Sequence, residues 1–307
     1  MRVLVTGATG FLGPFLCSRL LGAGHAVRAV ARDLARTAEI LGPSVEVVPI
    51  PGDAQEWANR IVGCDGIVNL AGASVAKRWT TAHKAEMHSS RVDLTRAMVE
   101  GIARLPEGGR PRALVSGSAV GYYGCGDEER NEASPGGSDF LARLCQDWEA
   151  EARRGEALGV RVVLLRIGVV LGLEGGALRK MLTPFRLCLG GPIAGGRQWM
   201  SWIHRDDLIR LAQLCLENEG IRGAVNACAP GATTNRELAQ TLASVLRRPC
   251  LLPVPAFVLR LALGEAAEMV ARGQRIRPEK ALAAGYTFRF PDLRGALENL
   301  LATGDAA

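Results

Sequence analysis

The sequence contains little lysine, histidine and tyrosine, and it has no long hydrophobic run. Among its 307 residues only four are lysine, four are histidine and three are tyrosine, so few positions can hold a catalytic base or an acidic phenol. No apolar stretch approaches the roughly 18 residues of a membrane-spanning helix. The chain opens directly into an apolar strand, which a signal peptide does not do. We therefore expect a cytoplasmic protein without a membrane partner.

Paired cysteines and clustered histidines are also absent from the sequence. The eight cysteines never form a C-x-x-C pair, and several lie inside apolar runs, which is typical of buried thiols in a reducing compartment. His83 and His88 are five positions apart, so on a helix they point in different directions. We expect no metal site.

The charge is mildly basic and dispersed. There are 37 basic and 31 acidic residues, which give a net charge of +6, and the arginines form no compact cluster of the kind that binds nucleic acid. We expect no nucleic-acid partner, although part of the excess can serve an anionic ligand. With 48% hydrophobic and 22% charged residues, the composition is that of an ordinary globular protein.

Short apolar runs alternate with helical periodicity over the first 170 residues or so. Near-continuous apolar runs are typical of parallel strands that are covered on both faces. The pattern predicts an α/β fold, a Rossmann-type doubly wound parallel sheet, with a smaller C-terminal substrate-side lobe. We place the first domain at residues 1–230 and the second region at 231–307, and expect a monomer or homodimer. The predicted strands are Arg2–Thr6, Ala26–Ala31, Val45–Val48, Gly66–Leu70, Ala113–Ser116, Val160–Ile167 and Ala224–Ala227. The predicted helices are Leu12–Leu21, Gln55–Ile61, Thr81–Arg104, Ser138–Arg154 and Asp207–Glu217.

A glycine-rich loop follows the first predicted strand and leads into a helix. Its three glycines are spaced as G-x-x-G-x-x-G, a pattern that is weak alone but specific in this position. A dinucleotide pyrophosphate needs such a tight turn and a helix N-terminus directed at the anion. The alternative is a plain turn between strand and helix. The predicted cofactor contacts of this loop are Gly7, Thr9, Gly10, Phe11, Leu12 and Gly13.

The end of the second predicted strand indicates which nicotinamide cofactor is bound. A carboxylate at this point hydrogen-bonds the ribose of NAD, whereas an arginine accommodates the 2′-phosphate of NADP. The position at which NAD-binding proteins carry this carboxylate is occupied here by Ala31, and Arg32 follows it. We therefore predict NADP as the cofactor. Asp33 leaves an alternative open, because it would be the acid if the strand were one or two residues longer.

Several motifs together resemble the extended short-chain dehydrogenase/reductase superfamily, and within it the group called epimerase family proteins, which are similar to nucleoside-diphosphate-sugar epimerases. The resemblance covers essentially the whole chain and implies the same fold and a nicotinamide cofactor. The motifs of the superfamily are Thr6–Gly13, Asn69–Gly72, Ser116–Ser118 and Tyr123-Gly124. Those of the group are Arg78-Trp79, Ser90-Arg91, Asp147–Glu149, Arg166–Gly172, Gly190–Gly195, Ser201–His204 and Pro278–Pro291.

The reactive pair of the superfamily is missing. The resemblance implies a tyrosine and a lysine four residues later on one helix, but no tyrosine of this chain has such a lysine. If Glu149 matches the glutamate that usually follows the pair, the two positions hold Leu141 and Cys145. Both lie on the apolar stripe of the helix Ser138–Arg154, so we predict that they are packing residues. The alternative is that Cys145 is a substitute thiol.

The resemblance leaves Ser118 and Tyr123 as the candidate catalytic residues, with Tyr122 beside them on the substrate side. Tyr123 would donate a proton and Ser118 would polarise a carbonyl. The alternative is that the two tyrosines only pack. We predict an NADP-dependent oxidoreductase or epimerase on a small carbonyl, hydroxyl or nucleotide-sugar-like substrate. A non-catalytic NADP(H)-binding sensor or regulatory protein is the alternative, because the reactive pair is absent.

The resemblance also assigns residues to the cofactor and the substrate beyond the glycine loop. For Glu86 and Arg91, the alternative to a cofactor contact is an ion pair on the helix surface. For His204, the alternative to a substrate contact is a structural role, since it precedes Asp206 and Asp207 at a helix start. The further cofactor positions are Ala31, Arg32, Leu70, Ala71, Gly72, Glu86, Arg91 and Val170. The further substrate positions are Arg166, Trp199, Trp202 and His204.

Overall fold

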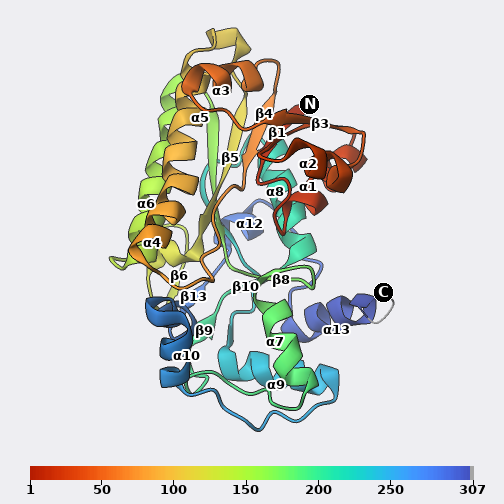
Figure 1. Cartoon of the computed structure of the whole chain (residues 1–307), viewed down its shortest axis with the longest axis vertical. Coiled ribbons are helices and arrows are strands. Elements are labelled where there is room, and N and C mark those ends of the chain that lie inside the picture. Colours follow the sequence, from red (N-terminus) through yellow and green to blue (C-terminus); the bar gives the residue numbers. More distant parts are fainter. Residues whose placement is uncertain (305–307) are drawn as a thin grey trace.

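A seven-stranded parallel sheet organises the larger part of the chain in the computed structural model, which describes residues 1–304 (for 262, 263, 303 and 304 the backbone alone). The strand order is β11-β7-β5-β4-β1-β2-β3, and every neighbouring pair is parallel. This confirms the predicted fold class (Figure 1). The strands are β1 (Arg2–Thr6), β2 (Ala26–Ala31), β3 (Val45–Pro49), β4 (Gly66–Asn69), β5 (Ala113–Ala119), β7 (Arg161–Ile167) and β11 (Gly223–Ala227).

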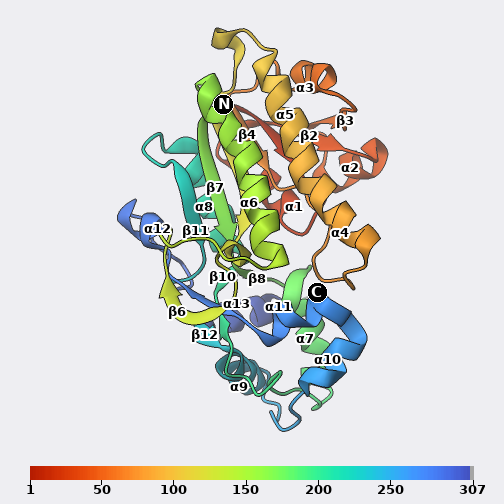
Figure 2. The same ribbon diagram turned by 90° about the vertical axis from the view of Figure 1, so that its left-hand side faces the viewer.

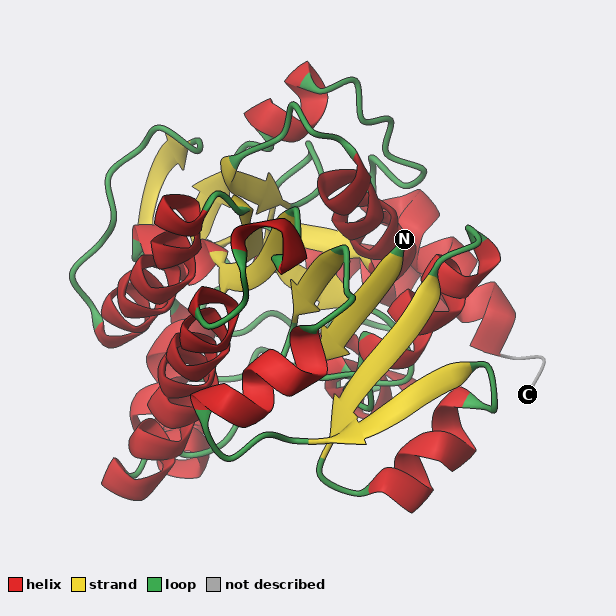
Figure 3. Cartoon of the chain, turned by 90° about the horizontal axis from the view of Figure 1, so that it is seen from above, coloured by secondary structure: helices red, strands yellow, loops and turns green. Residues whose placement is uncertain are grey.

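Helices cover both faces of the sheet, which explains why the strands are apolar at nearly every position. Alternate residues of a strand point to opposite faces, so Val3 and Val5 join one core cluster and Leu4 joins the other. The two helical layers lie on either side of the strands in Figures 2 and 3. One layer contains α1 (Gly13–Gly22), α2 (Leu34–Leu41) and α8 (Arg205–Glu217). The other contains α3 (Ala54–Ile61), α5 (Leu94–Ala103) and α6 (Phe140–Arg153).

The strand order reverses direction at β1. From β1 the chain continues through β2 to β3 on one side, and then through β4, β5, β7 and β11 on the other. In open α/β sheets a ligand binds outside the carboxyl ends of the strands at such a switch point. The loops that follow β1 and β4 are therefore the expected cofactor site.

The predicted helix Thr81–Arg104 is interrupted in its middle. It consists of α4 (Thr81–His88), a π-helical turn (Ser89–Asp93) and α5. A π turn adds one residue to a helical turn and often lies at a functional site. The turn re-aims Ser90 and Arg91, as described below.

A smaller lobe has its own core at the carboxyl side of the sheet. Its buried cluster joins Leu178 and Phe185 of α7 (Gly176–Arg186) to Leu238 and Leu297. The lobe therefore draws on residues from both sides of position 230. Its helices are α7, α9 (Asn235–Leu246), α10 (Ala256–Leu263), α11 (Ala267–Ala271) and α13 (Leu293–Gly304), whereas α12 (Glu279–Ala283) packs against β11 of the main sheet.

Short two-stranded sheets connect this lobe to the larger sheet. They pair β10 (Trp202–His204) with β8 (Val169–Leu171), β12 (Thr233–Thr234) with β9 (Trp199–Met200), and β13 (Gln274–Ile276) with β6 (Gly126–Arg130). Across residues 1–304, none of the helices has both the length and the apolar character that a bilayer crossing requires.

Candidate active site

The glycine loop between β1 and α1 has the shape that a pyrophosphate requires. Gly7 has a φ of 71°, and a Cβ there would lie 2.7 Å from the carbonyl oxygen of Leu70. A Cβ at Gly13 would collide with the backbone of Ala8. Leu12 at the N-cap of α1 offers no side-chain acceptor to the first helical N–H groups. These groups can therefore bind an anion, so the loop fits a dinucleotide.

At the end of β2, Arg32 and Asp33 have different environments. Arg32 is exposed directly after the buried Ala31. The Asp33 carboxylate accepts a hydrogen bond of 3.0 Å from the backbone N–H of Arg36 and so caps α2. Asp33 is exposed as well, but one of its carboxylate oxygens has this structural partner, whereas the guanidinium of Arg32 has no partner within the described residues.

The loop after β4 rests on the π turn of the interrupted helix. The Arg91 Nη2 donates to the carbonyl oxygen of Ala73 at 2.8 Å, and the Ser90 Oγ accepts from the Ala73 N–H at 2.9 Å. A Cβ at Gly72 would lie 2.7 Å from the Arg91 Cζ, so the loop and this guanidinium are in close contact. Arg91 thus supports the segment Leu70–Gly72, whereas Glu86 is exposed and bonds His83.

Phe11 and Val170 also meet at this edge of the sheet. A Cβ at Gly172 or at Gly175 would lie 2.7 or 2.8 Å from atoms of the Phe11 ring. A Cβ at Gly176 would lie 2.9 Å from the Val170 carbonyl oxygen. The glycine-rich segment after β8 therefore folds closely over Phe11. The structure brings these two predicted cofactor residues together with the glycine loop.

The predicted catalytic residues lie in a buried polar network instead of facing a ligand. The Ser118 Oγ donates to the Glu149 Oε1 at 2.7 Å, and the Tyr123 hydroxyl donates to the Asn226 Oδ1 at 2.7 Å. Arg166 donates two hydrogen bonds of 2.8 Å to Glu149 and one of 2.9 Å to the Tyr123 oxygen.

This network differs from the predicted roles of Ser118, Tyr123 and Arg166, and the reason is burial. The Tyr123 side chain is 0% exposed, and Ser118 and Arg166 are also buried. In this arrangement the Tyr123 hydroxyl, whose residue lines the cavity described below, donates to Asn226, so a proton transfer to a substrate would require this bond to break. Arg166 likewise has its guanidinium committed to Glu149 and Tyr123, so it does not face a substrate.

The electrostatics of the network favour fixed protonation states. Burial raises the pKa of Tyr123 to about 12, although Arg166 opposes the shift. Burial lowers the pKa of Arg166, but its hydrogen bonds and charge interaction with Glu149 outweigh this effect and raise it overall. The Arg166 Cζ also lies 3.4 Å from the ring centroid of the half-buried Tyr122. The ion pair of Glu149 and Arg166 is therefore a charged cross-link between α6 and β7.

The aromatic residues predicted to approach the substrate have mainly structural contacts. Trp202 is 0% exposed and donates from its indole N–H to the Gly231 carbonyl oxygen at 2.9 Å. His204 is also 0% exposed, and its Nδ1 accepts from the Asp206 N–H at the start of α8. For Trp202 this corrects the expected substrate contact, whereas for His204 it agrees with the structural alternative at the helix start. Trp199 is half-buried under the guanidinium of Arg275.

The two positions of the missing reactive pair differ in burial. Cys145 is 5% exposed, and burial raises its pKa to about 12, so the thiol is neutral at physiological pH. This confirms the prediction that Cys145 packs. Leu141, one turn earlier on α6, is only half-buried. It contacts a cavity.

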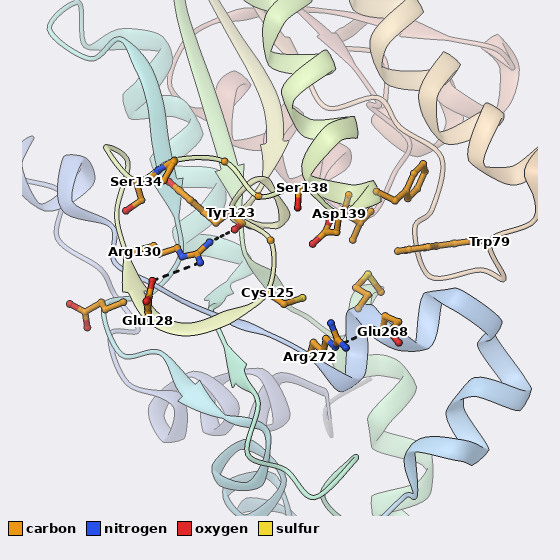
Figure 4. Close-up of a pocket in the computed structure, with 18 residues that line it drawn as sticks. Trp79, Tyr123, Cys125, Glu128, Arg130, Ser134, Ser138, Asp139, Glu268 and Arg272 are labelled. Atoms are coloured by element: carbon orange, nitrogen blue, oxygen red, sulfur yellow. Dashed lines mark hydrogen bonds and ion pairs between the residues drawn. The ribbon is translucent and has the colours of Figure 1, made fainter.

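That cavity, of about 560 Å³, opens between the start of α6, the strand β6 and the helix α11 (Figure 4). One part of its lining is apolar, with Trp79, Phe140, Leu141 and Met269. The other part is charged and comes from β6, from the loop before α6 and from α11. A cavity of this size holds a small molecule.

The sequence analysis missed three features of this region, namely Glu149, Asn226 and the cavity lining. Glu149 and Arg166 are charged residues at positions that the apolar pattern predicts to be buried. A charged side chain that is buried needs a partner of opposite charge, so the two residues could have been predicted to form an ion pair. No comparable pattern indicates the residues around the cavity. In the described part of the chain, no group of three or more His, Cys, Asp or Glu side chains is arranged to hold a metal ion.

The chain is similar to proteins of known family over nearly its whole length. It is 41% identical to the chloroplastic homologue of epimerase family protein SDR39U1 from Arabidopsis thaliana, over 98% of this chain and 87% of that one. It is 38% identical to epimerase family protein YfhF from Bacillus subtilis, over 98% of both chains. A crystal structure of human epimerase family protein SDR39U1 with NADPH matches at 38% identity, with a TM-score of 0.88 over 98% and 99% of the chains.

More distant structures share the fold alone. UDP-glucuronic acid 4-epimerase from Bacillus cereus, crystallised with UDP-glucuronic acid and NAD, has a TM-score of 0.79 at 16% identity, over 100% of this chain and 99% of that one. Residues 254–300 match a domain of unknown function. Residues 3–228 match the model of the NAD dependent epimerase/dehydratase family. On this match, and on relatives that are about 40% identical over the full length, the chain belongs to the NAD-dependent epimerase/dehydratase family.

Proposed function

We propose that this chain is an NADP(H)-dependent oxidoreductase or epimerase that acts on a small carbonyl or hydroxyl compound. The observation that carries the proposal is the position of the cavity. It is lined by Leu141, the position that the superfamily resemblance assigns to the reacting tyrosine. The cavity therefore lies where a substrate of the superfamily would meet the reactive end of the cofactor.

Support for the cofactor comes from the other end of the site. The glycine loop fits a pyrophosphate, and the accessible Arg32 suits the 2′-phosphate of NADP. One carboxylate oxygen of Asp33 is bound to the start of α2, which leaves Arg32 as the side chain at this edge without a partner in the described residues. The human relative, which is 38% identical, was crystallised with NADPH. When bound, NADPH supplies a hydride donor.

The buried network of Ser118, Tyr123, Glu149 and Arg166 holds together the elements that stand beside the cavity. Glu149 and Arg166 hold α6 against β7, and Ser118 and Tyr123 connect β5 and β11 to the same pair. The four elements therefore form one rigid support beside the cavity. Because the hydroxyls of Ser118 and Tyr123 already donate to partners within the network, we infer that the proton of the reaction comes from solvent or from a group of the cavity lining other than Tyr123.

The second candidate function is a non-catalytic NADP(H)-binding sensor. The burial of Ser118 and Tyr123 favours it, because neither residue is positioned for proton transfer. The sensor would use the same cofactor loop and would differ from the enzyme only in turnover.

A turnover assay separates the two candidates. We expect the chain to consume NADPH, followed by its absorbance, with at least one member of a panel of small aldehydes and ketones. Leu141→Trp should fill the mouth of the cavity and abolish this turnover while NADPH still binds, whereas Leu187→Trp on the surface should change neither. Absence of NADPH consumption with every carbonyl, together with absence of epimerised product from a matching panel of chiral hydroxyl compounds, in a protein that binds NADPH, would favour the sensor instead.

A further inference from the structure

We infer that the cavity takes an uncharged or cationic small molecule and rejects nucleoside diphosphate sugars, because the arginines that line it are already paired with carboxylates of the same lining. This inference depends on the proposed function in that it assigns a substrate class to the same site. Relatives of the fold that bind UDP-sugars share only 16 to 22% of their residues with this chain, so they do not decide the question.

The first arginine of the lining is Arg272, directly after α11. Its Nε lies 3.1 Å from the Glu268 Oε2, four residues earlier on the same surface. Arg260 of α10 binds the other oxygen of Glu268 at 3.3 Å. Glu268 is therefore shared by two guanidinium groups, and a diphosphate that binds Arg272 would compete with this carboxylate for the guanidinium.

The second arginine is Arg130 on β6. It donates from Nη1 to the carbonyl oxygen of Tyr123, and its Nη2 lies 4.0 Å from the Glu128 carboxylate. Figure 4 shows this guanidinium between the two partners instead of extending into the cavity. Arg130 is thus used to hold β6 against the turn that contains Tyr123.

The remaining charges of the lining are carboxylates. Glu129 is paired with Arg275 and Arg277, at 3.0 and 3.4 Å, and neither of these arginines lines the cavity. Asp139 accepts a bond of 2.9 Å from the Ala142 N–H with one oxygen. Its second oxygen makes no further hydrogen bond or ion pair within the described residues.

The lining therefore holds four carboxylates, from Glu128, Glu129, Asp139 and Glu268, and two guanidinium groups. Each of these guanidinium groups already has a carboxylate partner, so a ligand phosphate would compete with a carboxylate for every lining cation, and it would also meet Asp139, which forms no ion pair within the described residues. A hydroxyl or ammonium group, in contrast, can donate to the free oxygen of Asp139.

The apolar part of the lining limits the shape of the ligand. The rings of Trp79 and Phe140 are 5.3 Å apart and tilted by 56°, and the indole N–H of Trp79 already donates to the Val75 carbonyl oxygen. This wall therefore offers an aromatic surface without a free donor. A ligand with one apolar face and a hydrogen-bond donor on the other side matches the two parts of the cavity.

A binding experiment on the NADPH-loaded chain tests the inference without relying on turnover. UDP-glucose is titrated by calorimetry into the wild type, into Glu128→Gln/Glu268→Gln, and into the control Glu39→Gln/Glu107→Gln, whose glutamates are exposed and lie outside the cavity. We expect no binding at millimolar UDP-glucose in the wild type and control. The double variant at the cavity should gain affinity of about tenfold or more, because two guanidinium groups are released. Binding by the wild type, or no gain in the variant, would overturn the inference.

A series of aromatic aldehydes of equal shape tests the positive half of the inference. 4-Formylbenzamidine, 4-formylbenzamide and 4-formylbenzoate have planar para substituents of nearly equal size and carry charges of +1, 0 and −1, and the first two have N–H groups that can donate to Asp139. We expect dissociation constants to rise in that order, and the difference between the cation and the anion to shrink in Asp139→Asn. Equal or reversed affinities, or no binding by any of the three, would contradict it. If the order holds but no aldehyde is turned over, the substrate class stands and the proposed enzymatic function fails.

Discussion

The hydroxyl of Tyr123 has a structural role at the scale of single residues, and removing it tests this role. Tyr123→Phe leaves a buried amide oxygen of Asn226 and an N–H of Arg166 without a partner. An unsatisfied buried polar group costs about 1–3 kcal/mol. We expect the free energy of unfolding in urea to fall by that amount, while NADPH affinity is retained.

Tyr122→Phe is the matched control for this substitution. The hydroxyl of Tyr122 has no hydrogen bond within the described residues, so its loss should leave the stability nearly unchanged. If Tyr123→Phe instead unfolds like the wild type but loses all turnover, the hydroxyl acts in proton transfer and its structural role is refuted.

The reactivity of the cysteines provides a second test at the residue scale. A thiolate, not a thiol, reacts with disulfide reagents. Burial keeps Cys145 neutral by raising its pKa to about 12, whereas Cys125 is exposed. We expect labelling with a disulfide reagent to show a fast phase that includes Cys125. Cys145 should react only when the protein unfolds, with or without NADPH.

The corresponding substitution is Cys145→Ala. It should cost about 1 kcal/mol or less, because little volume is lost from the core. The variant Cys125→Ser identifies the fast phase in the labelling experiment. Rapid labelling of Cys145 that NADPH blocks would show that this thiol is close to the nicotinamide, against the packing role.

The elements differ in how far the sequence could predict them. The strands of the main sheet were predictable because both of their faces are buried, which leaves a continuous apolar run. The π-helical interruption at Ser89–Asp93 was not predictable. One extra residue in a turn moves the apolar positions only slightly, and the spacing of apolar residues along ordinary helices varies by more than that. The roles of Ser90 and Arg91 depend on this turn, so their contacts to Ala73 could not be derived either.

The start of α8 contains a pH-sensitive contact. The His204 Nδ1 accepts a bond from the Asp206 N–H and must be unprotonated to do so. Burial lowers the pKa of His204, so the unfolded chain binds a proton more tightly than the folded one. The stabilisation is therefore complete above the ordinary histidine pKa of about 6.5 and is lost progressively as the pH falls below it.

His204→Asn tests this contact. Asparagine caps a helix well but does not titrate. We expect the loss of unfolding temperature between pH 7.5 and pH 5.5 to be smaller in the variant than in the wild type. An equal loss in both proteins would mean that His204 does not contribute to the acid sensitivity.

At the scale of the whole molecule, the cofactor loop and the cavity differ in how many segments of the chain build them. The cofactor loop comes from one continuous segment after β1, which is why the spacing of its glycines could be recognised. The cavity is assembled from Trp79, from residues 123–141 and from residues 268–272. Such a lining has no local pattern, since its parts come together only through the docking of the smaller lobe. The sequence therefore predicted the cofactor better than the substrate.

The central claim of the account is that this chain binds NADP(H) at the glycine loop and recognises the 2′-phosphate through Arg32. Isothermal titration of the wild type and of Arg32→Ala with NADPH and NADH tests it most directly, with Arg143→Ala, an exposed arginine of α6, as the control. We expect NADPH to bind the wild type at least about tenfold more tightly than NADH, since a charged hydrogen bond to phosphate is worth about 1.5–3 kcal/mol. Arg32→Ala should remove this preference by weakening NADPH alone. Tighter binding of NADH, or an unchanged NADPH affinity in Arg32→Ala, would contradict the claim.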